Sequence, residues 1–356
     1  MTAIAYLPTD PESYNPPIGL IGAGNIAGTH LAAYRDAGYN VTVICDTVLD
    51  RAHSRRDEYF PGARITADYH EVLATPEIEV VDIATHVETR PELVRAALLA
   101  GKHVLSQKPF VLDLDEGERL ADLADREARL LAVNQNGRWA PHHSFLLGAV
   151  GSGLLGRLSS GDFALYWAHD EAVADHPVFS TLEDLILYDF GIHWFDLIAR
   201  VFCPAGQATS VYATLGRTAD QVIPVPTSAQ VVVTFPEASA TLLLRGSAHR
   251  AAFGGYRVDG SKAVVTSASA DELGGTDPQV RVHDQEGENV VNLKGNWWTN
   301  GMHGAMGELL AAIEAGRQPS NSARSALPGL ALCFAAMEAA RTGAPVDPRG
   351  VRRPPR

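Results

Sequence analysis

The sequence has few of the residues that mark a disulfide-stabilised or metal-binding protein. Only three of its 356 residues are cysteine, and Cys45, Cys203 and Cys333 lie far apart in apolar segments. This favours core thiols in a reducing compartment over a disulfide framework. Among the thirteen histidines, only the adjacent His142 and His143 form a close pair, so no metal site is predicted.

Other absences narrow the class further. No apolar run reaches transmembrane length, and the first ten residues lack the basic start and long apolar stretch of a signal peptide. We therefore expect a cytoplasmic protein that begins with an irregular arm, residues 1–16. The net charge of −13 argues against nucleic acid or an anionic membrane as a partner. Lysine is also scarce: only four of the 29 basic residues are lysine, and Lys108 is the one with a telling context.

A glycine-rich turn follows the first apolar run, residues 17–21. It reads Gly22-Ala-Gly24-Asn25-Ile26-Ala27-Gly28 and leads into an amphipathic helical pattern. Gly22 allows a tight turn, and Gly24 lets a pyrophosphate approach the backbone. The N–H groups at the start of the helix, near Asn25 and Ile26, would face the phosphates. The arrangement predicts a dinucleotide site, whereas a plain strand–turn–helix is the alternative.

An acidic residue, Asp46, ends the next apolar run, residues 41–45. It lies at the spacing from Gly24 at which a carboxylate reaches the adenosine ribose hydroxyls. A carboxylate there repels a ribose 2′-phosphate, which favours NAD over NADP. Because the basic Arg51 lies close by in the sequence, NADP remains an alternative cofactor.

Strand and helix patterns alternate as far as residue 134, which predicts an α/β fold with a doubly wound parallel sheet. The strands are expected at 18–21, 41–45, 79–84, 103–105 and 130–133, with helices near 26–37, 48–58, 89–100 and 114–128. We place a dinucleotide-binding Rossmann domain at residues 17–136. The length and the composition, 46% apolar and 20% charged, suit a two-domain globular protein.

Beyond a short helix near 142–150, period-2 runs dominate and predict a large, mostly antiparallel open sheet. Its strands are expected at 158–167, 210–215, 230–235, 241–247 and 290–293, and two helices near 301–315 and 323–341 close the chain. Residues 137–356 would then form an α+β domain for substrate binding and oligomerisation. Its strands carry apolar residues at successive positions, so one sheet face would expose an apolar patch and pair two chains. We expect a homodimer or a homotetramer.

Two clusters carry candidate chemistry. Asp189, His193 and Asp196 have the spacing of one helix face, so carboxylates would flank an imidazole and suit it as a general base. Lys108 follows a strand, where open α/β sheets bind their ligands, and a cis bond to Pro109 would hold it rigidly. Its ammonium could stabilise a developing alkoxide. Taken alone, the histidine is more often structural and the lysine is as often a surface residue.

Together these motifs resemble the Gfo/Idh/MocA family of oxidoreductases (glucose–fructose oxidoreductase, inositol dehydrogenase and relatives) over nearly the whole chain. The family's Glu-Lys-Pro corresponds to residues 107–109, its domain-junction motif to residues 135–141, and its Asp-x-x-x-His to Asp189 and His193. Three departures stand out: Gln107 replaces the Glu, Gln135 replaces a Tyr, and the Thr-Pro-x-x-x-His after the fourth strand reads Thr85-His86-Val-Glu-Thr-Arg90.

The resemblance implies NAD as cofactor and a catalytic pair of Lys108 and His193 that Asp189 orients. The residues implied at the cofactor are Gly22, Gly24, Asn25, Ile26, Asp46, Thr85, His86, Gln107, Lys108 and Asn136. Those proposed at the substrate are Arg138, Trp139, Trp167 and His193, with His169, Trp297, Trp298 and His303 as further pocket candidates. For each pocket candidate, ordinary packing is the alternative.

The sequence therefore predicts an NAD-dependent enzyme that oxidises a secondary hydroxyl of a sugar, polyol or glycoside. One alternative is a glycosidase that oxidises a ring hydroxyl, eliminates the aglycone and reduces the product again. A second alternative is a cofactor-binding protein without catalysis, against which the presence of Lys108, Asp189 and His193 argues.

Overall fold

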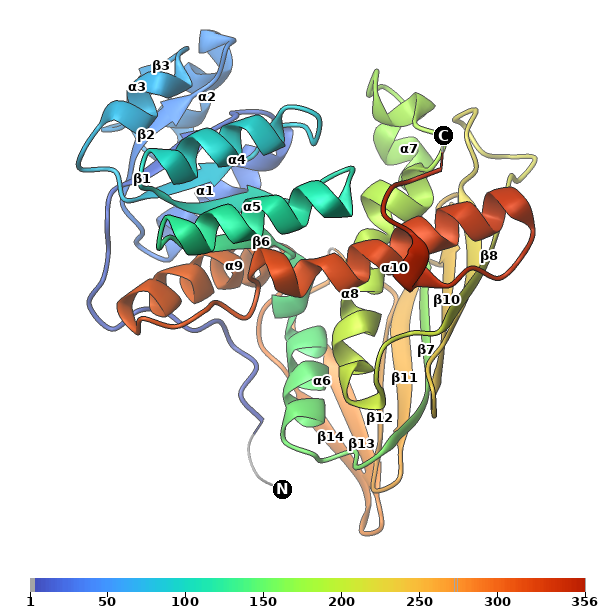
Figure 1. Ribbon diagram of the computed structural model, residues 1–356. Coiled ribbons are helices and arrows are strands. Elements are labelled where there is room, and N and C mark those ends of the chain that lie inside the picture. Colours follow the sequence, from blue (N-terminus) through green and yellow to red (C-terminus); the bar gives the residue numbers. More distant parts are fainter. Residues whose placement is uncertain (1–3, 272, 274, 356) are drawn as a thin grey trace. The chain divides into compact units, whose positions relative to one another are not determined.

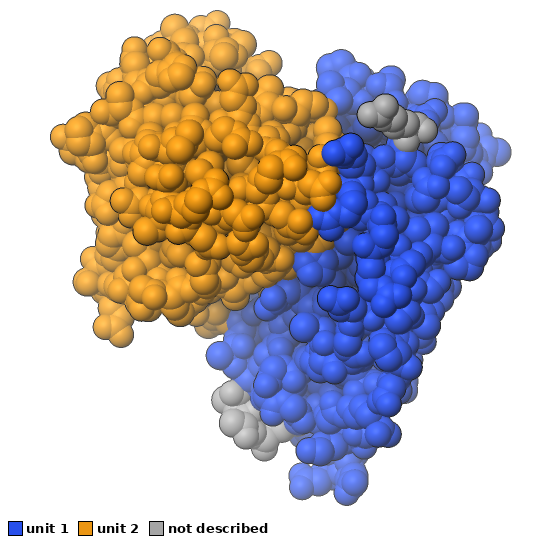
Figure 2. Space-filling view, in the orientation of Figure 1, with its two compact units in different colours: residues 1–6, 140–297, 328–356 blue, residues 7–139, 298–327 orange. Residues whose placement is uncertain are grey.

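A computed structural model describes residues 4–271, 273 and 275–355. These residues form two compact units, coloured separately in Figure 2. One unit holds residues 7–139 and 298–327, and will be called the dinucleotide unit. The other holds the chain up to Tyr6, residues 140–297 and residues 328–356, and will be called the sheet unit. The domain boundaries predicted from the sequence remain a prediction. The compact units divide the chain differently, because residues 7–16 and 298–327 belong to the same unit as the Rossmann segment.

The dinucleotide unit contains a six-stranded parallel sheet with the order β3-β2-β1-β4-β5-β6. Its strands are β1 (Ile18–Ile21), β2 (Val41–Cys45), β3 (Arg64–Thr66), β4 (Val80–Ile83), β5 (His103–Gln107) and β6 (Leu131–Asn134). Its helices are α1 (Asn25–Asp36), α2 (Leu49–Tyr59), α3 (Tyr69–Ala74), α4 (Arg90–Leu99), α5 (Leu114–Arg126), the 3-10 turn η1 (Asn136–Trp139) and most of α9 (Trp297–Glu314).

The central strands of this sheet are buried on both faces, which explains their near-continuous apolar sequences. Leu20 and Ile44 from the strands pack with Leu31 of α1, and Met306 and Leu309 of α9 complete the same core. A segment from far along the chain therefore closes the core of the first sheet.

The sheet unit contains eight strands in the order β14-β13-β12-β11-β7-β10-β9-β8. These are β7 (Leu158–Tyr166), β8 (Ser210–Gly216), β9 (Ser228–Thr234), β10 (Ser239–Arg245), β11 (Phe253–Gly260), β12 (Val264–Ser269), β13 (Gln279–Asp284) and β14 (Gly287–Asn292). Only β7 and β10 pair in parallel among them; the other neighbours are antiparallel. The α/β class and both sheet types predicted from the sequence are thus confirmed.

Helices cover one face of this sheet (Figure 1). They are α6 (Pro141–Gly151), α8 (Ile192–Val201) and the part of α10 (Ala323–Thr342) beyond Leu327. The unit also contains five short helical elements: α7 (His169–Val173), η2 (Phe179–Thr181), the π-helical turn η3 (Ile186–Phe190), η4 (Cys203–Ala205) and η5 (Pro348–Gly350). The other face is mixed. On β9, buried Val231 and Val233 alternate with exposed Gln230 and Val232, and Asp162 on β7 is exposed too. The expected patch is therefore interrupted by polar side chains.

Several sequence predictions were incomplete or wrong. The strands β3, β11, β12 and β13 and the helix α3 were not predicted. Cys203 is exposed, whereas Cys45 and Cys333 are core thiols as expected. The single helix predicted through Asp189 and His193 was wrong, because η3 ends at Phe190 and α8 begins at Ile192. A π-helical turn has a different residue period from an α-helix, so the simple i, i+4, i+7 face does not extend across Gly191.

Candidate functional site

The glycine-rich turn has the geometry that a pyrophosphate requires. Gly22 has φ +98°, and a Cβ there would lie 2.9 Å from the main-chain carbonyl of Ala84. Gly24 is the N-cap of α1, and no atom lies within 4 Å of where its Cβ would project. The backbone is therefore open at the point where the helix presents the N–H groups of its first turn, including those of Asn25 and Ile26. These residues fit a bound dinucleotide.

Asp46 lies beside this turn, at the end of β2. One carboxylate oxygen accepts the N–H of Ala23 at 2.8 Å, and the other accepts the N–H of Val48 at 2.8 Å. Each oxygen of an ionised carboxylate has a second lone pair, so the group can still accept hydrogen bonds from ribose hydroxyls. Asp46 thus fixes the turn and presents a negative charge at the same place.

A basic residue at the turn was missed in the sequence. Nη2 of Arg55 on α2 donates to the carbonyl oxygen of Gly24 at 3.1 Å, while Arg51 is exposed at the start of that helix. A Cβ on Gly28 would lie 2.9 Å from Nη1 of Arg55. The unexplained third glycine, Gly28, was the available signal, because it leaves the space that the guanidinium uses.

Lys108 follows β5 at the carboxyl end of the parallel sheet, and the Lys108–Pro109 bond is cis, as expected. The main chain around it is held by Arg90, which is buried at the start of α4. Arg90 donates to the carbonyl oxygens of Gln107 at 2.6 Å and Thr85 at 2.5 Å, and also to that of Pro109. The arginine that replaces the family's histidine therefore joins the two loops that follow β4 and β5.

Three further sequence candidates lie at or just beyond the carboxyl ends of β4, β5 and β6. His86 is exposed, and its carbonyl oxygen accepts the hydroxyl of Thr89 at 3.2 Å. Asn136 is buried in η1, where a Cβ on Gly301 would lie 2.9 Å from its carbonyl oxygen. Gln107 is buried, and its Oε1 accepts the N–H of Lys108 at 2.6 Å.

Arg138 and Trp139 are buried inside the dinucleotide unit. Arg138 donates to the carbonyl oxygen of Ser320 at 2.7 Å and to the hydroxyl of Ser325 at 3.1 Å. A Cβ on Gly304 would lie 2.2 Å from the Trp139 ring, so the indole packs directly on α9. Trp139 therefore anchors α9, and Arg138 anchors the segment that follows it.

Aromatic rings form a continuous wall in the sheet unit. The Trp167, His169 and Phe190 rings stack on one another with centroids 4.3–5.3 Å apart. Phe190 contacts Trp194 at 5.4 Å, and Trp194 stacks on Trp297 at 5.6 Å. His193, which is buried, meets Trp297 edge-to-face at 5.5 Å. Four sequence candidates, Trp167, His169, His193 and Trp297, are therefore brought together.

The remaining two pocket candidates belong to the dinucleotide unit. Trp298 is 38% exposed. His303 pairs with Asp10 through Nε2 at 2.7 Å, and its ring packs on Tyr39. His303 therefore holds the N-terminal segment.

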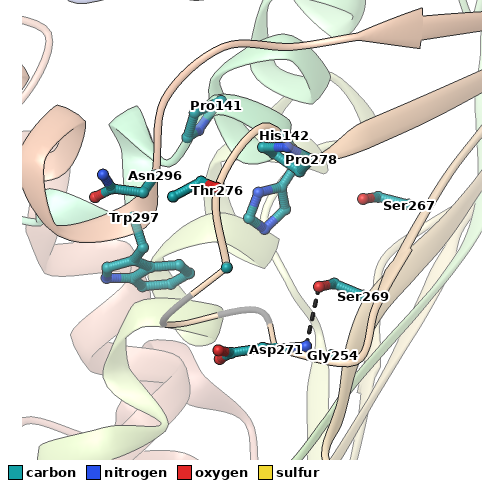
Figure 3. Close-up of a pocket in the computed structure, with 11 residues that line it drawn as sticks. Pro141, His142, Gly254, Ser267, Ser269, Asp271, Thr276, Pro278, Asn296 and Trp297 are labelled. Atoms are coloured by element: carbon teal, nitrogen blue, oxygen red, sulfur yellow. Dashed lines mark hydrogen bonds between the residues drawn. The ribbon is translucent and has the colours of Figure 1, made fainter.

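Figure 3 shows a small pocket in the sheet unit, next to Trp297. Its volume is about 20 Å³, which admits a water molecule and no sugar ring. Its walls come from the start of α6, from β11 and β12, and from the segment before α9: Pro141, His142, Gly254, Ser267, Ser269, Asp271, Gly275, Thr276, Pro278, Asn296 and Trp297.

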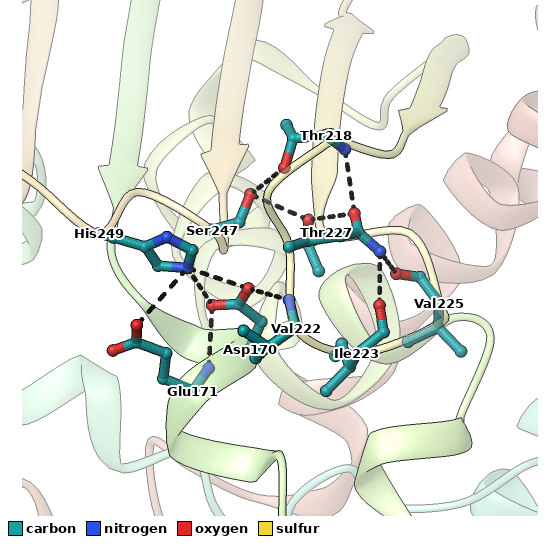
Figure 4. Close-up of polar contacts among 10 residues, drawn as sticks. Asp170, Glu171, Thr218, Val222, Ile223, Val225, Thr227, Ser247 and His249 are labelled. Atoms are coloured by element: carbon teal, nitrogen blue, oxygen red, sulfur yellow. Dashed lines mark hydrogen bonds and ion pairs between the residues drawn. The ribbon is translucent and has the colours of Figure 1, made fainter.

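A polar cluster fixes the loops beyond β7 and β10 (Figure 4). Nε2 of His249 lies 3.0 and 3.1 Å from the two carboxylate oxygens of Asp170, which is buried. Asp170 also accepts the N–H groups of Glu171 at 2.9 Å and Val222 at 3.0 Å. The hydrogen bond to Asp170 raises the pKa of His249, and the charges of Glu171 and Asp220 add to the shift.

Neither a metal centre nor a membrane span is found in the part of the chain that the structure describes. Its side chains form no group of three or more histidines, cysteines, aspartates or glutamates that could hold a metal ion. None of its helices is both long enough and apolar enough to cross a bilayer.

Two family models match the chain. An oxidoreductase family with an NAD-binding Rossmann fold matches residues 17–135, and the Gfo/Idh/MocA C-terminal domain matches residues 146–266. Together they span about two thirds of the chain.

Individual proteins are similar over different lengths. D-apiose dehydrogenase of Paraburkholderia graminis is 25% identical, with 92% of this chain and 88% of that protein covered. A glycosyl hydrolase family 109 protein of Streptomyces niveus is 29% identical, over 40% of this chain and 31% of its own. An oxidoreductase from Agrobacterium radiobacter, solved with NAD+, L-tartaric acid and magnesium, shares the fold with a TM-score of 0.80 at 21% identity, covering 94% of this chain and 99% of its own.

Proposed function

The chain belongs to the Gfo/Idh/MocA family of NAD-binding oxidoreductases, and on that basis we propose that it oxidises a secondary hydroxyl of a sugar, polyol or glycoside. Bound NAD+ supplies the acceptor for the hydride that leaves the reacting carbon. His193 takes the hydroxyl proton. The resemblance to the family is the basis for proposing that Asp189 orients His193. Lys108 donates a hydrogen bond to the hydroxyl oxygen and stabilises the negative charge that develops there.

The observation that carries this proposal is the way Lys108 is held. Arg90 fixes the main chain on both sides of the residue, and Gln107 accepts its N–H. The lysine stands at the carboxyl end of β5, the edge at which open α/β sheets bind ligands. Such rigid placement suits a group that must meet one oxygen atom in one orientation.

The sheet unit supports the substrate class. The partly exposed Trp167 offers an aromatic face of the kind that packs on the C–H faces of sugars. The buried Trp194 and Trp297 support the wall in which His193 lies. We propose Trp167 and His193 as substrate contacts. For Arg138 and Trp139 we propose a structural role instead, because Arg138 holds Ser320 and Ser325 and Trp139 packs on α9.

A second candidate function is a glycosidase that oxidises, eliminates and reduces again. The similarity to the glycosyl hydrolase family 109 protein of Streptomyces niveus favours it. Both functions use the same residues for the oxidation step, but the second regenerates NAD+ in each turnover and releases an aglycone.

One screen separates the two functions. D-apiose, inositols and p-nitrophenyl glycosides are incubated with the protein and NAD+, and NADH and p-nitrophenol are followed together. A dehydrogenase gives stoichiometric NADH with the free sugars, whereas the glycosidase releases p-nitrophenol with catalytic NAD+ and no net NADH. Neither signal with any substrate, from protein that binds NAD+, would overturn both and favour a non-catalytic binding protein.

We also propose that two chains pair through the open face of the eight-stranded sheet, in a homodimer or in a homotetramer built from such dimers. Leu243 on β10 and the exposed Tyr212 and Val232 provide apolar area on that face. The free thiols Cys45, Cys203 and Cys333 support a reducing compartment such as the cytoplasm.

A further inference from the structure

A group of polar side chains is buried beneath Lys108. His30 of α1 is 0% exposed, and its Nδ1 lies 2.7 Å from a carboxylate oxygen of Asp82, which is also 0% exposed. On the other side of the ring, Nε2 lies 2.9 Å from Nε2 of Gln107 and 3.1 Å from Nδ2 of Asn134. Helix α1 and strands β4, β5 and β6 each contribute one member.

The hydrogen bonds determine the tautomer of His30. Oε1 of Gln107 accepts the N–H of Lys108 at 2.6 Å, so the amide nitrogen of Gln107 must point at His30 and donate. Nε2 of His30 is therefore an acceptor and carries no proton. The proton is on Nδ1, where it is donated to Asp82.

The phenol of Tyr34 agrees with this assignment. The hydroxyl of Tyr34 donates to the same Asp82 oxygen at 2.8 Å. Burial and the Asp82 charge raise the pKa of Tyr34 well above its usual value, so the phenol stays a donor. Asn134 donates toward Sδ of Met302 at 3.4 Å as well, and the Tyr39 ring packs on Tyr34. The cluster thus holds one negative charge, on Asp82, and a neutral imidazole.

We propose that His30 is a positioning residue for Lys108. Held as the Nδ1–H tautomer by Asp82, it orients the Gln107 amide, and the amide in turn holds the Lys108 main chain. The glutamine that departs from the family's Glu-Lys-Pro is then matched to a neutral histidine. A glutamate would aim a second buried carboxylate at an unprotonated nitrogen and would require His30 to take up a proton. The inference rests on the proposed role of Lys108.

Two substitutions separate the two sides of the ring. In His30→Asn, the amide nitrogen reaches the position of Nδ1 and can still donate to Asp82, but the acceptor for Gln107 is lost. In His30→Gln, the amide oxygen reaches the position of Nε2 and can accept from Gln107, but Asp82 loses a donor. Because a buried carboxylate that lacks a donor is costly, His30→Gln should be the less stable variant.

We expect activity to follow the opposite order. On the substrate found by the screen above, kcat of His30→Asn should fall about ten- to hundredfold, the scale of a misplaced catalytic group, with little change in KM for NAD+. His30→Gln should stay within about threefold of the unsubstituted protein despite its lower melting temperature. A purely structural role predicts that loss of activity follows loss of stability, and that result would overturn the proposal.

A second readout needs no substrate. Reductive ¹³C-methylation labels the lysines and the N-terminal amine, and Lys108→Arg identifies the signal from Lys108. That signal should shift in His30→Asn and keep its position in His30→Gln. In Gln107→Glu the signal should also shift, because the introduced carboxylate has no N–H to donate to the unprotonated nitrogen of His30. An unmoved Lys108 signal in His30→Asn and Gln107→Glu overturns the proposal.

The two proposals fail in distinguishable ways. If Lys108→Ala retains full turnover, the proposed function of Lys108 is wrong, whatever the NMR signals show. The imidazole ¹⁵N shifts of His30, identified by their absence in His30→Gln, report its tautomer independently. An Nε2–H tautomer or an imidazolium near neutral pH contradicts the positioning role even if Lys108 is catalytic.

Discussion

Arg90 donates a hydrogen bond to the main-chain oxygen of Gln107 at 2.6 Å, from inside the dinucleotide unit. The same guanidinium holds the carbonyl oxygens of Thr85 and Pro109. Arg90→Met should leave buried carbonyl groups without donors and lower the free energy of unfolding by about 3 kcal/mol. Urea denaturation measures this. Arg95→Met, on the exposed face of the same helix, is the matched control and should cost little.

Cofactor choice should depend on Asp46. The unsubstituted protein should bind NAD+ far better than NADP+, and Asp46→Ala should narrow that difference, because the carboxylate that repels a 2′-phosphate is gone. Titration calorimetry with both cofactors measures the ratio. Asp50→Ala, on α2, is the control for a general change of charge. Equal affinity of the unsubstituted protein for both cofactors contradicts the assignment, and Arg55 would then be the residue to substitute next.

Loss of the general base should slow the reaction without releasing the cofactor. His193→Ala should reduce turnover by about 10²–10⁴-fold and leave NAD+ affinity unchanged, because the Rossmann fold lies in the other unit. His176→Ala, also in the sheet unit, is the control. Near-normal turnover of His193→Ala would contradict the assignment of His193 as the general base, and Lys108 would be the next candidate.

The loops in Figure 4 should loosen as the pH rises. The pKa of His249 is raised by its hydrogen bond to Asp170. Its contribution to stability is therefore complete below about pH 6.5, the ordinary value, and is lost as the pH rises through the higher folded pKa. Hydrogen exchange at the Val222 amide, corrected for intrinsic rate, should show this loss of protection. His249→Gln should remove the pH dependence, and His283→Gln, on β13, should leave it in place.

The assembly prediction is tested on the exposed sheet face. Light scattering should show a dimer or tetramer at micromolar concentration, and Leu243→Arg should shift it toward monomer by placing a charge in the interface. Leu99→Arg, at an exposed position of α4 in the dinucleotide unit, makes the same substitution outside that face and should leave the assembly unchanged. A monomeric unsubstituted protein refutes the prediction.

The sequence predicted those elements whose pattern is local and strong. β1 and β2 were placed to the residue, because each is a continuous apolar run before a turn. β11 was missed because it contains two adjacent glycines and an arginine, which weaken the β signal. The parallel pairing of β7 with β10 has no local signature at all, since both strands read as ordinary alternating segments.

The residues of the site could be predicted where they belong to one local motif. They could not be predicted where the site depends on contacts between segments that are distant in the sequence. Gly22, Gly24 and Asp46 follow from one βαβ pattern. By contrast, His30 and Arg90 owe their importance to partners 52 and 17 residues away in sequence. The sequence showed Gln107 and Arg90 only as departures from a family pattern. The break between η3 and α8 left no trace either, because π-helical and α-helical turns use the same residues.

The position of α9 has a consequence for synthesis on the ribosome. Met306, Leu309 and Leu310 fill the core of the first sheet, and Asn321 donates to the carbonyl oxygen of Val133 at 3.2 Å. These residues leave the exit tunnel only after every strand of the second sheet has emerged. The core of the first domain to be translated is thus completed only after the strands of the second have been made. A nascent chain stopped before residue 297 should be protease-sensitive in the Rossmann segment, and release of the full chain should protect both units together.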